Sequence, residues 1–281
     1  MATPESNPAL LIPRLVSRVW GGSRLRALAA GSVTSGPIGE AWFGDADERP
    51  EGVLVKLLDV QDRLSVQVHP NDELAQEVHG AGALGKHEAW VILEAAPGAE
   101  ILLGRDPRVS AEEVTRALAT GGDVTPLLAR HKVQRGDVFN VPTGCLHAMM
   151  PGLFIWEVQQ RSDRTYRVAD WGRNDPTRPL HRAEALRATD ADHRATRTSF
   201  IEWGRPGEQL LLESPHFSAR AVVGPWTGAI VVGAHGATAT VIGGGRVEGQ
   251  SLGDLETVQL AAGLQSVDLA AGAVLLIAEG N

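Results

Sequence analysis

Short apolar runs separated by glycine and proline are the feature that most restricts the fold of this 281-residue chain. The chain contains 32 glycines and 16 prolines, and these residues leave little room for long helices. Short runs between turn-forming residues are typical of β-strands. The clearest ones cover residues 53–60, 64–68, 89–93, 138–141 and 153–158. We therefore expect a mainly β protein.

Patterns typical of helices are few. Asn71 is placed to cap a short helix over residues 72–78, and Ser110 and Glu113 have capping-box spacing ahead of residues 114–119. Residues 180–195 are a third helical candidate. Short β-type runs return from about residue 213. This change predicts an N-terminal domain over residues 1–212 and a smaller C-terminal β-domain over residues 213–281.

Composition excludes several classes of partner. The net charge of -8 disfavours nucleic acid, because phosphate backbones bind basic surfaces. Residues 1–13 lack the features of a signal peptide, and we expect a cytoplasmic protein that binds a small molecule and no membrane. The single cysteine, Cys145, rules out an internal disulfide and a multi-cysteine zinc site. The sequence leaves the oligomeric state open.

Three segments carry polar residues that could form a site. Residues 64–70 alternate, so a strand would place apolar residues, Leu64 included, on one face and three polar residues on the other: Ser65, Gln67 and His69. Lys86 and Glu88 would likewise share a face, with His87 turned away. A solvent-facing strand and a surface ion pair remain the alternatives for these two segments.

The third segment runs from Gly136 to His147 with the spacing G-x5-P-x-G-x2-H, which resembles the second motif of the cupin superfamily. Such a bend projects His147 inward. With Gln67, His69 and Glu88, it would supply two imidazoles, a carboxylate and an amide oxygen. This donor set suits Zn²⁺, with Fe²⁺ or Mn²⁺ as alternatives.

Glu157 is a carboxylate within the apolar run 153–158. Burial of a carboxylate in such a strand is costly unless the group is paired or functional. An edge strand that exposes Glu157 to water is the alternative.

Together these residues resemble type I phosphomannose isomerases, particularly their short bacterial form. The resemblance covers about the first 175 residues, and its most specific elements are Gln67-x-His69-Pro70 and Ser162-Asp-x-Thr-Tyr-Arg167. It implies a cupin-type antiparallel β-barrel, or jelly roll. It also implies a metal-dependent aldose–ketose isomerase that interconverts mannose 6-phosphate and fructose 6-phosphate through an enediol.

The resemblance also implies roles for individual residues. It assigns the metal to Gln67, His69, Glu88 and His147, and it assigns catalytic-site positions to Lys86, Glu157 and Arg167. It pairs Lys56 with Ser65 at the substrate phosphate. Two residues depart from the family pattern: His87 replaces a common threonine, and Arg161 near the active-site motif could alter the preference for substrate charge.

Several points stay open at this level. Lys86, Glu157 and a metal-bound water are all candidates for the catalytic base. An iron-dependent cupin dioxygenase and a noncatalytic sugar-phosphate-binding regulator are rival functions. A hairpin turning at Gln61-Asp62 would place Lys56 directly opposite Gln67. The tryptophans, by contrast, are expected to be packing residues outside the site.

Overall fold

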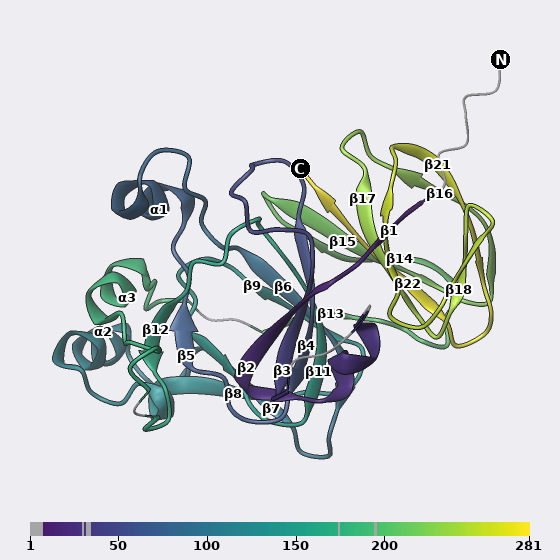
Figure 1. Ribbon diagram of the computed structural model, residues 1–281. Coiled ribbons are helices and arrows are strands. Elements are labelled where there is room, and N and C mark those ends of the chain that lie inside the picture. The colour runs from purple at the N-terminus through teal and green to yellow at the C-terminus, as the bar shows by residue number, and fades with distance from the viewer. Residues whose placement is uncertain (1–7, 30, 32–34, 174, 194–195) are drawn as a thin grey trace.

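The computed structural model describes residues 8–29, 31, 35–173, 175–193 and 196–281. Its N-terminal part holds two antiparallel sheets (Figure 1). The seven-stranded sheet has the order β13 (Arg197–Phe200), β9 (Asp137–Val141), β6 (Glu88–Ala95), β11 (Leu153–Gln159), β4 (Leu54–Val60), β2 (Arg14–Gly22) and β3 (Ile38–Phe43). The five-stranded sheet has the order β12 (Tyr166–Ala169), β5 (Val66–Val68), β10 (His147–Met149), β7 (Glu100–Arg105) and β8 (Leu128–Lys132).

Two further antiparallel sheets are built mainly from the C-terminal part of the chain. A six-stranded sheet has the order β1 (Ala9–Leu11), β20 (Thr257–Leu260), β17 (Ala237–Ile242), β22 (Val274–Gly280), β15 (Phe217–Val223) and β14 (Gly207–Glu213). A four-stranded sheet has the order β16 (Trp226–Val232), β21 (Gly263–Leu269), β18 (Gly245–Val247) and β19 (Gln250–Leu252). Hydrogen bonding from β1 and β14 crosses the predicted boundary at residue 213, and the two-domain division stays a prediction.

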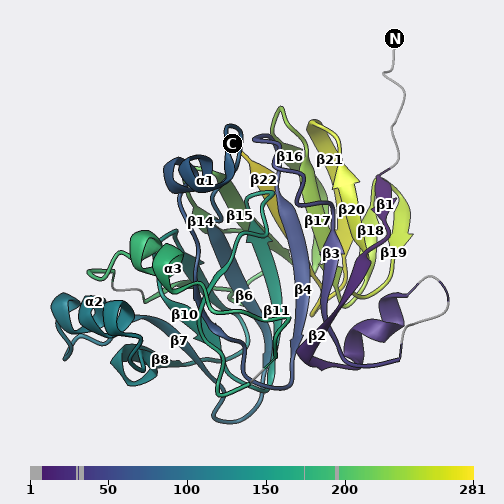
Figure 2. The same ribbon diagram turned by 60° about the vertical axis from the view of Figure 1, so that its left-hand side comes forward.

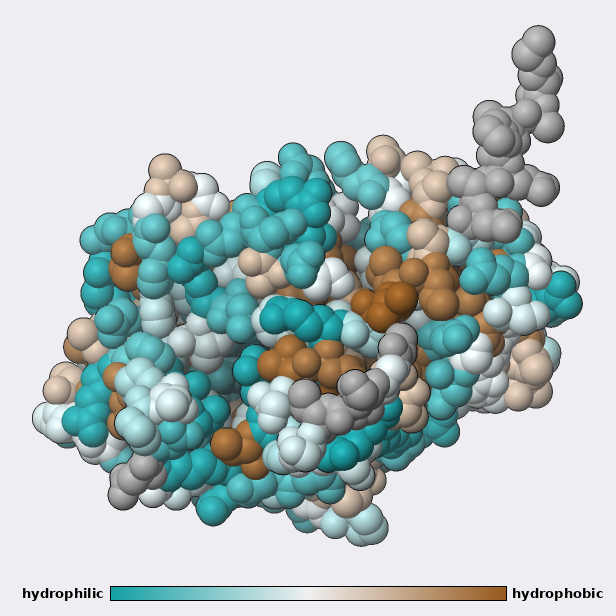
Figure 3. Space-filling model, viewed as in Figure 1, coloured by the Kyte–Doolittle hydropathy of each residue, from teal (hydrophilic) through white to brown (hydrophobic). Residues whose placement is uncertain are grey.

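The four sheets are stacked, with an apolar core in each space between them (Figure 2). Leu58 and Ile92 of the seven-stranded sheet pack with Ile101 of the five-stranded sheet. Trp156, on the other face of the seven-stranded sheet, packs with the six-stranded sheet through Phe217. Because these cores take up most large apolar residues, hydrophilic residues cover much of the visible surface (Figure 3).

Short helices lie beside the five-stranded sheet (Figure 1). They are α1 (Asp72–His79), α2 (Ala111–Thr120) and α3 (Arg182–Ala188). Two 3-10 turns, η1 (Arg24–Leu28) and η2 (Thr125–Leu127), complete the helical elements of the described residues. Asn71 caps α1, and Ser110 forms the predicted capping box of α2. No helix in the described part of the chain is long and apolar enough to cross a membrane.

The mainly β expectation is confirmed. The predicted barrel takes the form of facing sheets, and the hydrogen-bonded ladders do not close into one ring among the described residues. This jelly-roll arrangement leaves a space between the five-stranded and seven-stranded sheets. One end of that space is filled by the apolar core, and the other is lined by polar side chains.

Candidate active site

Three polar residues form a row across the five-stranded sheet. Gln67 of β5 lies directly opposite His147 of β10 on one side and Arg167 of β12 on the other. Directly opposed residues of antiparallel strands point to the same face. The side chains of Val66 and Val68 pack on the other face with the helices, as the alternation predicts.

The predicted position of Leu64 is wrong. The regular strand begins only at Val66, so the alternation does not extend back to Leu64. Leu64 instead packs in the core between the sheets and lines the same cavity as Ser65.

A second row faces the first from the seven-stranded sheet. Glu157 of β11 lies between Lys56 of β4 and Trp90 of β6, and Lys56 is also opposite Trp42 of β3. Lys56 and Glu157 are only 2% and 3% exposed. Glu157 is therefore a buried, inward-facing carboxylate, and the edge-strand alternative is wrong.

The predicted hairpin between β4 and β5 is also wrong. β4 pairs with β11 and β3 in one sheet, and β5 pairs with β10 and β12 in the other. The residues between them carry the chain across the sandwich and do not reverse it within one sheet. Lys56 and Ser65 nevertheless line the same cavity, from opposite walls.

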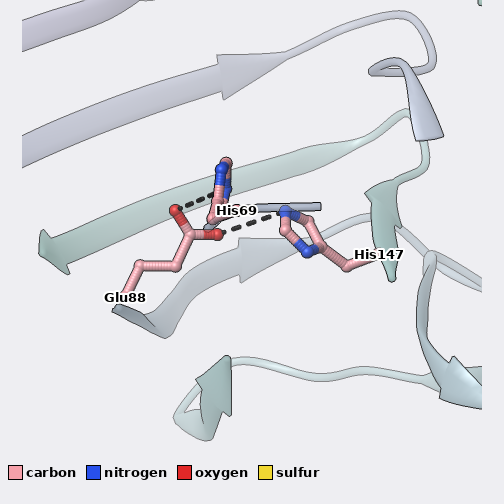
Figure 4. A group of neighbouring side chains, drawn as sticks. All are labelled: His69, Glu88 and His147. Carbon is pink, nitrogen blue, oxygen red and sulfur yellow. Dashed lines mark ion pairs between the residues drawn. The ribbon is translucent and has the colours of Figure 1, made fainter. Parts of the chain in front are cut away.

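His69, Glu88 and His147 meet where the two rows approach each other (Figure 4). His69 Nε2 lies 3.3 Å from one carboxylate oxygen of Glu88, and His147 Nε2 lies 3.4 Å from the other. The three ligating atoms lie within 4.8 Å of one another. The Gly144 amide donates to the carbonyl of His69 at 2.9 Å, which ties the bend before His147 to His69.

Backbone carbonyls orient both imidazoles. His69 Nδ1 lies 2.8 Å from the carbonyl oxygen of Arg164, and His147 Nδ1 lies 2.9 Å from that of Cys145. With each Nδ1 as the donor, each Nε2 presents a lone pair to the centre, as a metal-binding histidine requires. His147 Nε2 and Glu88 Oε1 are buried and have no hydrogen-bond partner in the described part of the chain. These atoms fit a bound cation.

The protonation states also suit a metal site. Burial lowers the pKa of His147 to about 3, and burial together with the charge of Lys86 lowers the pKa of His69. Burial opposes ionisation of Glu88, but its pKa is held well below its ordinary value, chiefly by the charge of Lys86. The cluster therefore presents two neutral imidazoles and one carboxylate, with the Gln67 amide alongside.

Two further charged groups flank the cluster. Lys86 Nζ is hydrogen-bonded to Glu88 and lies 3.2 Å from His69 Nε2. Burial opposes its charge, but Glu88 and other carboxylates outweigh burial and raise its pKa. Burial and the nearby charge of Glu88 raise the pKa of Glu157 to about 7. Trp90 donates to Glu157 at 3.0 Å.

A cavity of about 240 Å³ lies between the two rows. Its walls include the predicted Lys56, Ser65, Gln67, Lys86, Glu157 and Arg167. Sequence reasoning missed other lining residues: Arg18, Trp20, Glu40, Asp163, Thr165 and Arg178. Asp163 and Thr165 belong to the Ser162–Arg167 motif, which was the one signal that could have identified them.

Lys56 has more partners than the sequence indicates. Its Nζ lies 3.6 Å from Glu157 and 3.4 Å from Asp163, and it sits 4.1 Å from the centroid of the Trp42 ring. Trp42 and Trp90 thus contact polar members of the site, in addition to packing.

The two departures from the family pattern lie outside the cavity. His87 points away, as predicted, and its Nε2 is 2.7 Å from Asn140 Oδ1. Arg161 forms a two-point ion pair with Asp47 and is not part of the cavity lining among the described residues.

Known proteins resemble this chain in sequence. Residues 43–86 match the model of the phosphomannose isomerase type I catalytic domain. A protein named probable mannose-6-phosphate isomerase, from Bacillus subtilis, is 35% identical, with 67% of this chain and 70% of that protein covered. The chain belongs to the type I phosphomannose isomerase family. A mannose-6-phosphate isomerase from Streptococcus mutans is 33% identical, with coverage of 64% and 67%.

Solved phosphomannose isomerases share the fold. The mannose 6-phosphate isomerase from Bacillus subtilis superimposes with a TM-score of 0.81 at 28% identity, covering 98% of this chain and 100% of that one. A zinc-bound mannose 6-phosphate isomerase superimposes with a TM-score of 0.75 at 14% identity, with coverage of 98% and 100%. The expected fold class is therefore confirmed, and the likeness to a phosphomannose isomerase extends over nearly the whole chain.

Proposed function

We propose that this protein is a metal-dependent isomerase that interconverts mannose 6-phosphate and fructose 6-phosphate. Its membership of the type I family supports this reaction. The observation that carries the proposal is the buried pair of unpartnered atoms, His147 Nε2 and Glu88 Oε1, within the part of the chain that the structure describes. They lie beside a lysine and a carboxyl group that can act on a sugar.

Zn²⁺ is the proposed cofactor, and the proposed ligands are Gln67, His69, Glu88 and His147. The close approach of the ligating atoms of three of these residues, within 4.8 Å of one another, supports this set. Gln67 is directly opposite His147 in the sheet, so its amide oxygen can complete the set. When bound, the ion would polarise the sugar carbonyl and stabilise negative charge on the enediol oxygens.

Glu157 is the proposed proton carrier. Burial raises the pKa of this carboxyl group above its ordinary value, which suits a group that both accepts and releases a proton near neutral pH. As the carboxylate, it would remove the proton from C2 of the open-chain aldose. The resulting carboxylic acid would return the proton to C1 while the hydroxyl proton of O2 passes to O1, which yields the ketose without any net redox change. The hydrogen bond from Trp90 would fix the orientation of the carboxyl group.

Lys86 and Arg167 would act as cations. Neighbouring carboxylates hold Lys86 in the ammonium form, so it is suited to donate hydrogen bonds to sugar oxygens rather than to accept a proton from carbon. Arg167 Nε is buried and lacks a partner among residues with described positions. We assign Arg167 to stabilising the enediolate, since a guanidinium stays charged.

Lys56 and Ser65 are the proposed substrate-binding residues. They lie on opposite walls of the cavity and could hold one ligand between them. A sugar phosphate is then the small-molecule partner, and we propose that the reaction takes place in the cytoplasm.

A coupled assay on a panel of sugar phosphates tests the proposal. We expect rapid conversion of mannose 6-phosphate and fructose 6-phosphate by the zinc-loaded protein. Oxygen consumption without isomerisation would point to the rival dioxygenase. Binding of the sugar phosphate without turnover in a metal-replete sample would point to the noncatalytic regulator.

A further inference from the structure

Lys86 is buried at the centre of the site, although its backbone belongs to no regular element. Helix α1 ends at His79 and strand β6 begins at Glu88. Residues 80–87, all of which have described positions, form neither helix nor strand. Lys86 is nevertheless only 4% exposed. Something other than a helix or sheet ladder must fix the direction of its side chain.

Three successive amide groups around Lys86 are each held by a hydrogen bond. The Gly85 amide donates to Asp72 Oδ1 at 2.6 Å, and the His87 amide donates to Gln160 Oε1 at 2.9 Å. Between them, the Lys86 amide donates to the carbonyl of Pro70 at 3.1 Å. Two of the three acceptors are therefore side chains from elsewhere in the chain.

The two side-chain acceptors are joined to each other. Gln160 Nε2 donates to Asp72 Oδ1 at 3.0 Å, so one carboxylate oxygen receives both Gly85 and Gln160. Asp72 lies in the first turn of α1, just after His69 and Pro70, and Gln160 directly follows strand β11. The pair thus connects the His69 segment, the Lys86 segment and the end of the strand that carries Glu157.

The Lys86 segment packs closely against the backbone that follows His69. A Cβ atom added at Gly85 would lie 2.6 Å from the carbonyl oxygen of Pro70 and 2.7 Å from the carbonyl carbon of Asn71. Ser162 Oγ also donates to the carbonyl of Leu84 at 3.0 Å. The segment is pressed against the backbone next to His69, where Lys86 Nζ lies 3.2 Å from His69 Nε2.

We propose that Asp72 and Gln160 are positioning residues for Lys86 in the isomerisation. This inference rests on the catalytic role of Lys86 in the proposed function. The two side chains hold the backbone on both sides of Lys86, so that its ammonium group meets the reacting sugar oxygens in one orientation. Removal of either side chain lowers turnover more than it weakens binding, because a misplaced catalytic group slows the reaction even when the ligand still enters the cavity.

Asp72→Ala and Asp72→Asn separate positioning from charge. Asp72→Ala removes the shared acceptor, and Asp72→Asn keeps an oxygen that can accept from Gly85. Glu73→Ala is the matched control, because Glu73 is an exposed acidic residue in the same first turn of α1. We expect Asp72→Ala to lower kcat on the order of 10- to 100-fold with KM changed less than about threefold. Asp72→Asn restores most of kcat, and Glu73→Ala matches wild type.

A double-mutant cycle distinguishes positioning from general loss of structure. In a Lys86→Met background, adding Asp72→Ala is expected to lower kcat by less than about twofold, because both changes act through the same group. All turnover numbers are taken per zinc-loaded, folded protein. Equal kcat for Asp72→Ala and Glu73→Ala, or fully additive losses in the cycle, would overturn the inference.

Amide hydrogen exchange gives a readout that does not depend on activity. Asp72→Ala is expected to speed exchange at the Gly85 amide about tenfold or more, as the loss of one hydrogen bond implies. Exchange in α2 serves as the internal control. If wild type did not isomerise the sugar phosphate, the proposed function would fail. Hydrogen exchange alone would then test whether Asp72 holds the Lys86 segment, and an unchanged exchange rate at the Gly85 amide would overturn that inference.

Discussion

His147 Nε2 lies 3.4 Å from Glu88 Oε1, and neither buried atom has another hydrogen-bond partner in the described residues. The low pKa of His147 keeps its ring neutral, and the Cys145 carbonyl takes the proton of Nδ1. Two lone pairs therefore face each other away from water. Such an arrangement is unfavourable unless a cation lies between the atoms. This relationship is the physical basis for the proposed metal site.

His147→Ala removes one nitrogen ligand. We expect lower zinc content after purification and the loss of most turnover, because the remaining residues cannot complete the coordination. Zinc analysis of the dialysed protein checks the first effect, and the coupled assay checks the second. His235→Ala, at an exposed position, is the control. Full zinc content and normal turnover in His147→Ala would remove His147 from the site.

Arg167→Lys keeps the positive charge but loses the planar guanidinium. We expect a folded, zinc-loaded protein whose kcat is reduced on the order of 100-fold, the usual cost of losing one strong electrostatic contact in a dry site. Saturating steady-state kinetics measure the effect. Arg161→Lys is the matched control, because Arg161 pairs with Asp47 outside the cavity lining. Equal kcat values for wild type and Arg167→Lys would contradict the assigned role.

The raised pKa of Glu157 predicts that the stability of the metal-free protein depends on pH. The pKa of Glu157 is about 7 in the folded state and near 4.5 in the unfolded chain. The folded state therefore binds the proton more tightly, and this carboxyl group lowers the free energy of unfolding as the pH rises through that window. Glu157→Gln lacks the effect. Urea unfolding of both proteins at pH 5 and pH 7.5 measures the effect. Between these pH values, the change in the free energy of unfolding should be less favourable in wild type than in Glu157→Gln, and equal changes in the two proteins would refute the raised pKa.

Lys56 is expected to distinguish the phosphorylated sugar from the free sugar. Lys56→Ala should raise KM for mannose 6-phosphate while zinc content stays near that of wild type, because Lys56 is not a proposed metal ligand. Mannose itself should be affected much less. The deciding quantity is the ratio of kcat/KM for mannose 6-phosphate to that for mannose. A ratio unchanged by the substitution would exclude Lys56 from phosphate recognition.

Local pattern predicted many of the strands and the direction of several polar side chains. Alternation correctly placed Gln67 and His69 on the polar face, and the glycine–proline bend correctly turned His147 inward. These features depend on a few neighbouring residues. Donor chemistry had already grouped Glu88 with these residues, and the family resemblance assigned the same set to the metal.

Long-range pairing could not be predicted in this way. Lys56 lies opposite Glu157, which is about 100 residues away in sequence, and no turn between β4 and β5 indicates this. A one-residue change of register would turn Lys56 to the other face. Arg18 and Glu40 were missed for the same reason, because they reach the cavity through the pairing of β2 with β3. Arg178 reaches it from a loop without any local signal.

Metal dependence of the isomerisation tests the central claim most directly. The measurement is turnover of mannose 6-phosphate to fructose 6-phosphate before chelation, after complete removal of metal, and after addition of Zn²⁺, with folding monitored throughout. We predict activity in the first state, near-complete loss in the second while the protein stays folded, and recovery in the third. Full turnover by the folded, metal-free protein would contradict the account.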